Sequence, residues 1–334
     1  MLTTSSLPAE PAAANAALAE AMGELDLTLG AIKRDQALGV FRRHFARIQS
    51  AVAERFERGD LSGLGAARQL AALTEGLIRL IFTYALARSG AEPDQKLALA
   101  ATGGFGRGLL APSSDIDPLF LSDAEPTGPI RQVVEFLLYL LWDLGLKVGH
   151  ATRSLADCLN VATADLSVRT ALLDARLLEG DGALFARFAA RFRAECIEGA
   201  LSAFLAGKAA ERAARHQRYG DSPFLVEPNI KEGRGGLRDL QILYWMAKAA
   251  FNVADITTLG ALPGAEGILS AIEERRFRRS LEFLWSVRLH LHYVTGRAEE
   301  RLTFDLQPVV GARMGYTRHG RQDGVERFMR HYFL

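Results

Sequence analysis

Hydrophobic side chains recur at helical spacing in the first part of the chain. Apolar residues follow one another at intervals of three or four, with polar residues between them, at Phe41, Phe45, Ile48, Val52 and Phe56. This spacing predicts an amphipathic helix that ends near Gly59. A second helix is expected over residues 66–89, and the sequence Gly-Ala-Glu-Pro-Asp at 90–94 predicts a break after it.

The next part of the chain contains short apolar runs and one leucine-rich segment. Residues 96–101, 115–121 and 146–152 have the length and composition of strands, and residues 130–144 predict a helix. Pro118 has no N–H group to donate to a sheet, so it indicates a strand edge or a bulge.

From residue 183 onward the pattern is helical again. The helices expected over residues 238–248 and 277–294 are separated from the preceding helical segment by residues 227–236, where Pro228 and three glycines predict an irregular loop. We therefore predict an α+β protein with a small mixed-sheet core. Its parts are an N-terminal helical segment at 1–90, the core at 91–182 and an all-helical domain at 183–334.

The candidate chemistry lies between the first two predicted strands. Gly-Gly-Phe-Gly-Arg-Gly at residues 103–108 precedes Ser-Asp-Ile-Asp at residues 114–117. Glycine permits positive φ and lets a ligand approach backbone N–H groups, which can bind phosphate oxygens. Residues two apart on a strand point to the same face, so Asp115 and Asp117 would meet one ligand.

Two carboxylates on one face suit Mg²⁺, which binds proteins through one or two carboxylates together with substrate phosphates. The pattern therefore predicts metal-assisted phosphoryl or nucleotidyl transfer, with Asp115 and Asp117 as metal ligands and catalytic residues. Neither a Walker loop nor a dinucleotide-binding fold matches these residues well. The alternative is that Ser-Ser-Asp-Ile-Asp is an ordinary turn before a strand.

These two motifs resemble the signature of the DNA polymerase beta-type nucleotidyltransferases, in the version found in bacterial PII uridylyltransferases. The blocks at residues 226–241, 301–307 and 324–330 are similar to the helical domain of the same family and occur in the same order. The resemblance implies that the core at 91–182 is a nucleotidyltransferase core. It also implies UTP as donor and a tyrosine hydroxyl of the PII signalling protein as acceptor.

We assign nucleotide binding to Gly103, Gly104, Arg107 and Ser114, which belong to the glycine and aspartate motifs. Lys231 and Arg238, in and after the irregular loop, could offset charge on the leaving pyrophosphate. The alternative is a turn between helices that its own charges hold in place.

The third predicted strand offers no carboxylate to complete the metal site, since its candidate positions hold Lys147, Gly149 and His150. Either two aspartates suffice, or Asp174 folds back as a third ligand. The resemblance further implies an amino-terminal portion without uridylyl-removing and glutamine-sensing domains. The apolar side chains of its last helix, such as Phe328, would then be exposed.

Composition narrows the class of protein. The net charge of +1 does not favour a nucleic-acid binder. Lys208, Arg212, Arg215 and Arg218 form a basic stripe at helical spacing, which is typical of a solvated helix face but leaves room for nucleotide or partner contacts. Cys158 and Cys196 are read as structural. No apolar run reaches the length of a membrane span and no signal peptide is evident, so we expect a cytoplasmic protein.

Three other functions stay open. A nucleotidyltransferase that acts on another protein would share the glycine motif and the aspartates, although residues 227–231 argue against it. An RNA-end nucleotidyltransferase would need a basic groove. A non-catalytic module that binds nucleotide or PII is the third alternative, because the third carboxylate is unaccounted for.

Overall fold

The computed structural model describes residues 16, 19, 23, 32–89, 96–126, 128–219, 222, 224–253, 255–259 and 269–334. The predicted break at residues 90–94 lies outside these residues. The chain forms two compact units. The first comprises Met1–Arg55, Arg68–Leu110 and Ser114–Cys196, and the second comprises Phe56–Ala67, Ala111–Ser113 and Ile197–Leu334. The division at 1–90, 91–182 and 183–334 stays a prediction.

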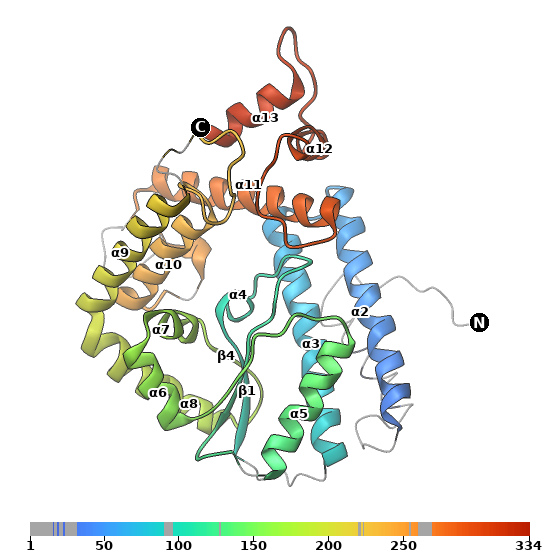
Figure 1. Cartoon of the computed structure of the whole chain (residues 1–334), viewed down its shortest axis with the longest axis vertical. Coiled ribbons are helices and arrows are strands. Elements are labelled where there is room, and N and C mark those ends of the chain that lie inside the picture. The colour runs from blue at the N-terminus through green and yellow to red at the C-terminus, as the bar shows by residue number, and fades with distance from the viewer. Residues whose placement is uncertain are drawn as a thin grey trace. The chain divides into compact units, whose positions relative to one another are not determined.

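The first unit begins with the long helices that the periodicity predicts. They are α2 (Arg34–Glu57) and α3 (Gly63–Ser89), and α5 (Gly128–Asp143) packs with them (Figure 1). Tyr84 of α3 lies between the others, with its ring centroid 6.0 Å from that of Phe41 in α2 and 5.9 Å from that of Phe136 in α5. Its hydroxyl donates a hydrogen bond to the Ile32 carbonyl at 3.0 Å.

Among the described residues, α3 is long and apolar enough to cross a membrane by length and composition, which the sequence analysis did not anticipate. Within its most apolar stretch of 18 residues, 56% is buried inside the protein. Four of its apolar side chains, Leu77, Ile78, Ile81 and Phe82, are fully buried. This burial is typical of a core helix.

The sheet of the first unit has the strand order β3-β2-β1-β4. Its strands are β1 (Leu97–Ala101), β2 (Pro118–Ser122), β3 (Ala151–Ser154) and β4 (Arg176–Gly180). The pairs β1–β2 and β1–β4 are antiparallel and the pair β2–β3 is parallel, so the sheet is mixed. Every residue of the central strands β1 and β2 is buried. The predicted α+β class is confirmed.

The predicted strands differ from the observed ones in extent. The run 96–101 matches β1, but 115–121 was too early, because β2 starts at Pro118 and Ile116 forms only an isolated bridge with Val148. Pro118 is the first residue of its strand, where a missing N–H is tolerated. The run 146–152 overlaps β3 by two residues, and β4 was not predicted.

Short helices complete the first unit. They are α4 (Gly103–Gly106), α6 (Leu155–Ala164), α7 (Leu166–Leu173), α8 (Gly182–Arg191) and the π-helical turn η2 (Phe192–Ile197). Cys158 and Cys196 are buried free cysteines, with the Cys196 sulfur 3.7 Å from the Leu159 carbonyl oxygen. Their burial agrees with a structural role.

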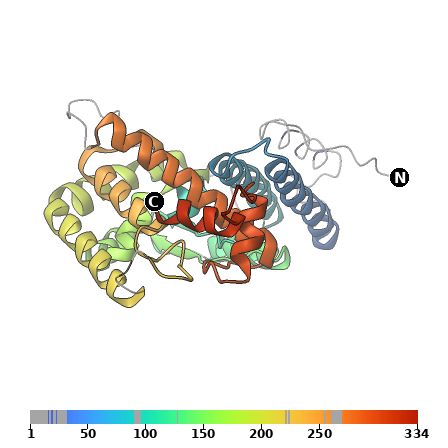
Figure 2. The same ribbon diagram turned by 90° about the horizontal axis from the view of Figure 1, so that it is seen from above.

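The second unit is helical. It contains η3 (Glu198–Ala200), α9 (Leu201–Tyr219), α10 (Leu237–Phe251), η4 (Ile256–Thr258), α11 (Ala271–Thr295), α12 (Leu306–Arg313) and α13 (Gly324–Phe333). Helix α10 packs against α9 and α11, while α12 packs against α11 and α13 (Figure 1 and Figure 2). The irregular loop predicted over residues 227–236 is present between α9 and α10.

The expected exposure of Phe328 was wrong. This side chain is completely buried in a cluster with Ile230, Val287, Leu291, Leu302 and Val310. Its ring centroid lies 5.4 Å from that of Tyr316, and the backbone of Gly311 packs directly against it. The last helix therefore contributes to the core of its own unit.

We predict that Phe328→Ala destabilises the protein by about 3–5 kcal/mol, because it leaves a cavity in this cluster. The matched control is Phe304→Ala, since Phe304 is 62% exposed. Denaturant unfolding followed by tryptophan fluorescence measures both free energies. A similar small loss for the two variants would contradict the role of Phe328 in the core.

Candidate functional site

Asp117 lies directly before β2 and is bordered by Thr102, Gly103 and Gly149. Its backbone carbonyl accepts hydrogen bonds from the N–H and the hydroxyl of Thr102, at 3.0 and 2.9 Å. A Cβ on Gly103 would lie 2.9 Å from one carboxylate oxygen of Asp117, and a Cβ on Gly149 would lie 2.7 Å from the other. The carboxylate thus lies in a gap between Gly103 and Gly149, which we call its cradle. A side chain at either position would occupy that gap.

The two aspartates precede the strand instead of lying within it, so the strand-based argument that they share a face does not apply. Ile116, between them, is held by hydrogen bonds from its N–H to the Lys147 carbonyl and from the Gly149 N–H to its own carbonyl, both at 2.9 Å. Asp115 is exposed and Asp117 is half-buried. Ser114, directly before them, is also half-buried.

The glycine motif forms the single turn α4 instead of an open loop. The Gly106 N–H donates to the Thr102 carbonyl at 2.8 Å, and the Arg107 N–H donates to the Gly103 carbonyl at 3.1 Å. Gly103 has a φ of +56°, which the absence of a Cβ makes accessible. Gly103 and Gly104 are both half-buried.

Arg107 and Asp174 form a buried ion pair. An Arg107 guanidinium nitrogen lies 2.5 Å from the Asp174 carboxylate, and the two side chains are 8% and 0% exposed. A Cβ on Gly106 would lie 2.2 Å from the Asp174 carbonyl oxygen, so glycine is required there as well. Among the described residues, no group of three or more His, Cys, Asp or Glu side chains could hold a metal ion. Asp174 as a third metal ligand is therefore not supported.

The predicted nucleotide ligands Lys231 and Arg238 belong to the second unit, in and after the loop between α9 and α10. Arg238 donates to Glu232 at 3.0 Å and to Gln241 at 2.9 Å, and its guanidinium lies 5.4 Å from the centre of the Trp245 ring. Lys231 is half-buried. Burial lowers the pKa of Lys231, and the positive charge of Arg288 acts in the same direction.

The basic stripe of α9 is only partly the solvated face that its spacing suggested. Lys208 and Arg215 are buried, at 1% and 7% exposure, while Arg212 and Arg218 are exposed. The Lys208 ammonium lies 2.5 Å from Glu211 and 4.5 Å from the centre of the Trp245 ring. Buried cations are costly unless they are paired, which explains these contacts.

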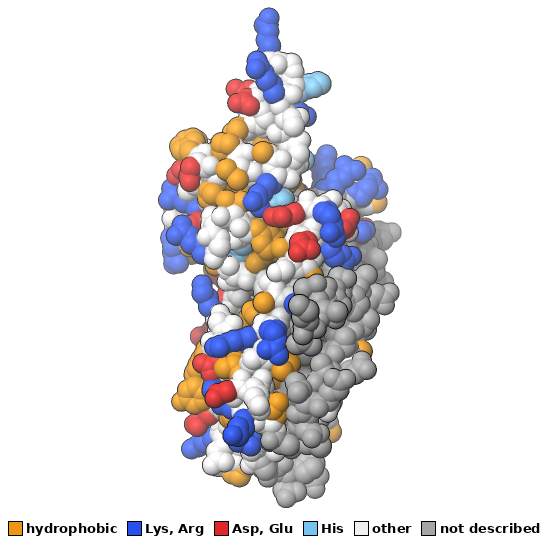
Figure 3. Space-filling view, turned by 90° about the vertical axis from the view of Figure 1, so that its right-hand side faces the viewer, with side chains coloured by type: hydrophobic (Ala, Val, Ile, Leu, Met, Phe, Trp, Pro, Cys, Tyr) orange, Lys and Arg blue, Asp and Glu red, His pale blue; other side chains and the backbone are white. Residues whose placement is uncertain are grey.

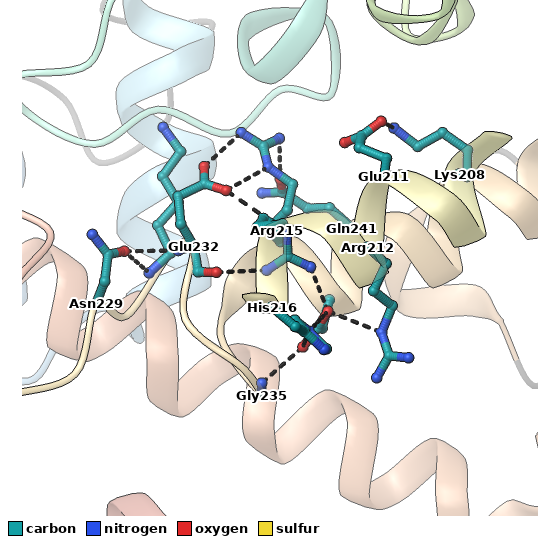
Figure 4. A network of polar contacts seen from close by, with 12 residues as sticks. Lys208, Glu211, Arg212, Arg215, His216, Asn229, Glu232, Gly235 and Gln241 are labelled. Atoms are coloured by element: carbon teal, nitrogen blue, oxygen red, sulfur yellow. Dashed lines mark hydrogen bonds and ion pairs between the residues drawn. The ribbon is translucent and has the colours of Figure 1, made fainter. Parts of the chain in front are cut away.

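Asp239 links α9 to the loop. Figure 4 shows its partners Arg215, His216 and Gly235. Its carboxylate accepts hydrogen bonds from Arg215 at 2.5 Å, from His216 at 3.0 Å and from the Gly235 N–H at 2.7 Å. Arg215 also donates to the Glu232 carbonyl at 2.6 Å. Although burial raises the pKa of Asp239, these donors outweigh it and lower the pKa overall. The loop is therefore attached to a helix by a compact set of charges.

A second charged cluster holds the start of the loop. Arg288 of α11 donates to both carboxylate oxygens of Glu300, at distances from 2.6 to 3.1 Å. His292 Nε2 lies 3.6 Å from Oε1 of the same carboxylate. Burial acts to raise the pKa of Glu300, but His292 and Arg288 outweigh it and lower the pKa to about 2. The sequence analysis did not single out any of these three residues.

Comparison with known proteins supports the resemblance. Residues 203–334 match the family described as GlnD PII-uridylyltransferase. The chain is 50% identical over 99% of its length to a bifunctional uridylyltransferase/uridylyl-removing enzyme of Gluconobacter oxydans, and 43% identical over 96% to the enzyme of that name from Nitrobacter hamburgensis. It covers 35% and 34% of these relatives, so it spans about a third of their length.

The lowered pKa of Glu300 predicts that the free energy of unfolding depends on pH. Its pKa in the folded protein is about 2, below the ordinary 4.5, so the stabilisation is present above pH 4.5 and is lost as the pH falls toward 2. We expect Glu300→Gln to cost about 3 kcal/mol at pH 6, and the difference from the unchanged protein to shrink steadily below pH 4.5. Urea unfolding between pH 3 and pH 6 measures this, and a difference that does not vary with pH would contradict it.

Proposed function

Since this chain belongs to the bacterial bifunctional uridylyltransferase/uridylyl-removing enzymes and matches their amino-terminal portion, we propose that it is a nucleotidyltransferase. The reaction we propose is transfer of UMP from UTP to a tyrosine of the PII signalling protein, with release of pyrophosphate. The proposal extends the activity named for the relatives to a chain that spans about a third of their length.

The observation that carries the proposal is the cradle around Asp117. The Asp117 carboxylate leaves no room for a Cβ at Gly103 or Gly149. Asp115, two residues earlier, is exposed. Carboxylate oxygens are the hard ligands that Mg²⁺ prefers, and one or two suffice when substrate phosphates supply others. The residues present therefore fit Mg²⁺, which Asp115 and Asp117 would hold. When bound, the ion supplies charge stabilisation for the phosphates and for the developing negative charge.

The other residues of the motifs would position the substrates. The backbone of Gly103 and Gly104 and the hydroxyl of Ser114 are the groups we assign to the triphosphate. The tyrosine hydroxyl of the acceptor loses its proton to solvent, and its oxygen attacks the α-phosphorus in line. A new O–P bond forms while the bond from the α-phosphorus to the bridging oxygen breaks, and that oxygen leaves with pyrophosphate. Such reactions depend mainly on positioning and charge stabilisation. Arg107 acts through its ion pair with Asp174, which holds α4 in place.

Lys231 is the better of the two loop candidates for offsetting charge on the pyrophosphate. Arg238 already has Glu232, Gln241 and Trp245 around its guanidinium, which supports the structural alternative for that residue. We keep both in the proposal as residues of the nucleotide site, and we expect the larger effect from Lys231.

Neither a nucleic acid nor a membrane enters the proposal, and we place the reaction in the cytoplasm. Among the described residues on the face drawn in Figure 3, Lys and Arg side chains are interspersed with acidic and apolar ones. An RNA end as acceptor would call for a concentrated basic surface, whereas the proposal of UTP and PII rests on the relatives.

The decisive experiment incubates the chain with Mg²⁺, a PII protein and each of the four ribonucleoside triphosphates in turn. Intact mass of the PII subunit is the measurement. We expect a gain of one uridylyl group with UTP, and loss of at least about a hundredfold in rate for Asp115→Asn and for Asp117→Asn, since each removes a metal ligand. Transfer of another nucleotide would change the donor, and no transfer despite UTP binding would favour the non-catalytic module.

Gly149→Ala tests the cradle without removing a carboxylate. The added Cβ would meet only the end of the Asp117 side chain, so Asp117 must turn aside while the fold is retained. We expect a change in unfolding free energy below about 1 kcal/mol, together with a loss of transfer of about tenfold or more. The control is Gly128→Ala, where a Cβ would have nothing within 4 Å. Equal rates for the two variants would show that the orientation of Asp117 is unimportant.

A further inference from the structure

The chain passes from the second unit to the first between Ser113 and Ser114, directly before the aspartates. Within the second unit, the Ser113 N–H donates a hydrogen bond of 3.4 Å to His292 Nδ1. The His292 side chain is 0% exposed. The last residue of the second unit before Asp115 is therefore held by a buried imidazole.

The imidazole has a defined orientation. Because Nδ1 accepts the Ser113 hydrogen bond, a neutral ring carries its proton on Nε2, which lies 3.6 Å from Glu300 Oε1. Arg288 binds the same carboxylate through two of its nitrogens and is itself only 8% exposed. Burial lowers the pKa of His292, which favours the neutral ring that can accept at Nδ1.

The backbone at Glu300 and Leu302 contacts the loop that carries Lys231. The Glu300 carbonyl accepts a hydrogen bond from the Ile230 N–H at 2.8 Å, and the Leu302 N–H donates to the Pro228 carbonyl at 2.9 Å. The Asn229 side chain then accepts from the Lys231 N–H at 3.0 Å. Ser113 is thus held by the side chain of His292, and residues 228 and 230 are held by the backbone of Leu302 and Glu300.

We propose that His292 is a positioning residue for the transfer reaction. It fixes the backbone at Ser113, two residues before the proposed metal ligand Asp115. This inference rests on the proposed function, because it assigns His292 the role of holding the backbone that leads into Asp115. The competing explanation is that His292 merely fills space in the core beside α11.

Two amide variants separate these explanations. In His292→Asn the carboxamide oxygen can take the place of Nδ1 and accept from Ser113, whereas in His292→Gln the amide reaches the place of Nε2. Gln is closer to His in size, so a residue that only fills space tolerates Gln better than Asn. A positioning residue that acts through Nδ1 gives the opposite order. The matched control is His290→Asn, because His290 is also buried on α11 but packs on Phe56, with ring centroids 4.5 Å apart.

The first readout is amide hydrogen exchange of the peptide that contains Ser113, which needs no substrate. We expect exchange about fivefold to tenfold faster in His292→Gln, the change that losing one hydrogen bond gives, and near-normal exchange in His292→Asn and His290→Asn. The second readout is transfer to PII. Here we expect His292→Gln to lower kcat about tenfold with little change in KM for PII, and His292→Asn to restore most of kcat.

Unchanged exchange at Ser113 in His292→Gln, or equal acceleration in all three variants, would overturn the positioning role. Normal kcat in His292→Gln alongside faster exchange would overturn it too, because the held backbone would then not matter for transfer. Failure of the proposed function looks different: the unchanged protein itself then transfers no nucleotide. In that case the exchange pattern alone decides whether His292 holds Ser113.

Discussion

The placement of the Asp117 carboxylate between Gly103 and Gly149 is the constraint on which the first unit depends. It requires a residue without a Cβ at Gly103, whose φ is also positive and which is the first residue of the turn α4. It also requires Gly149 to lie beside β2, which the bridge between Ile116 and Val148 and the parallel β2–β3 pairing provide. One carboxylate thus explains two glycines that are far apart in the sequence, since either Cβ would displace it.

The second unit differs from the first in that several positively charged side chains are buried in it. Lys208, Arg215, Arg288 and His292 are each less than a tenth exposed. Burying a charge costs free energy unless an opposite charge and hydrogen bonds compensate, and each of the first three side chains has a carboxylate within 3 Å. Such pairs add little net stability compared with apolar packing, but they fix the geometry of the backbone segments that they join. Both clusters lie next to the loop at residues 227–236.

The sequence predicted the α+β class and most helices, because amphipathic periodicity survives in the folded structure. It failed where partners come from distant positions. The basic stripe of α9 suggested a solvated face, but the carboxylates of Asp239 and Glu232 in the following segment pair with Arg215. Phe328 was expected to be exposed, but Gly311 and Tyr316 cover it. The candidate aspartates follow from a local motif, whereas the need for Gly149 follows only from a tertiary contact.

Arg107 is a motif residue whose guanidinium already has a partner within the protein. Spacing within the glycine motif suggested a direct nucleotide contact, but its guanidinium is buried against Asp174. Asp174 follows α7, and its backbone carbonyl packs against Gly106 so closely that no Cβ fits. The ion pair and this backbone contact therefore lock α4 to the end of α7 from two sides. Gly103 is the first residue of α4 and borders the Asp117 carboxylate. The two contacts of α4 with Asp174 therefore fix the position of Gly103 beside that carboxylate.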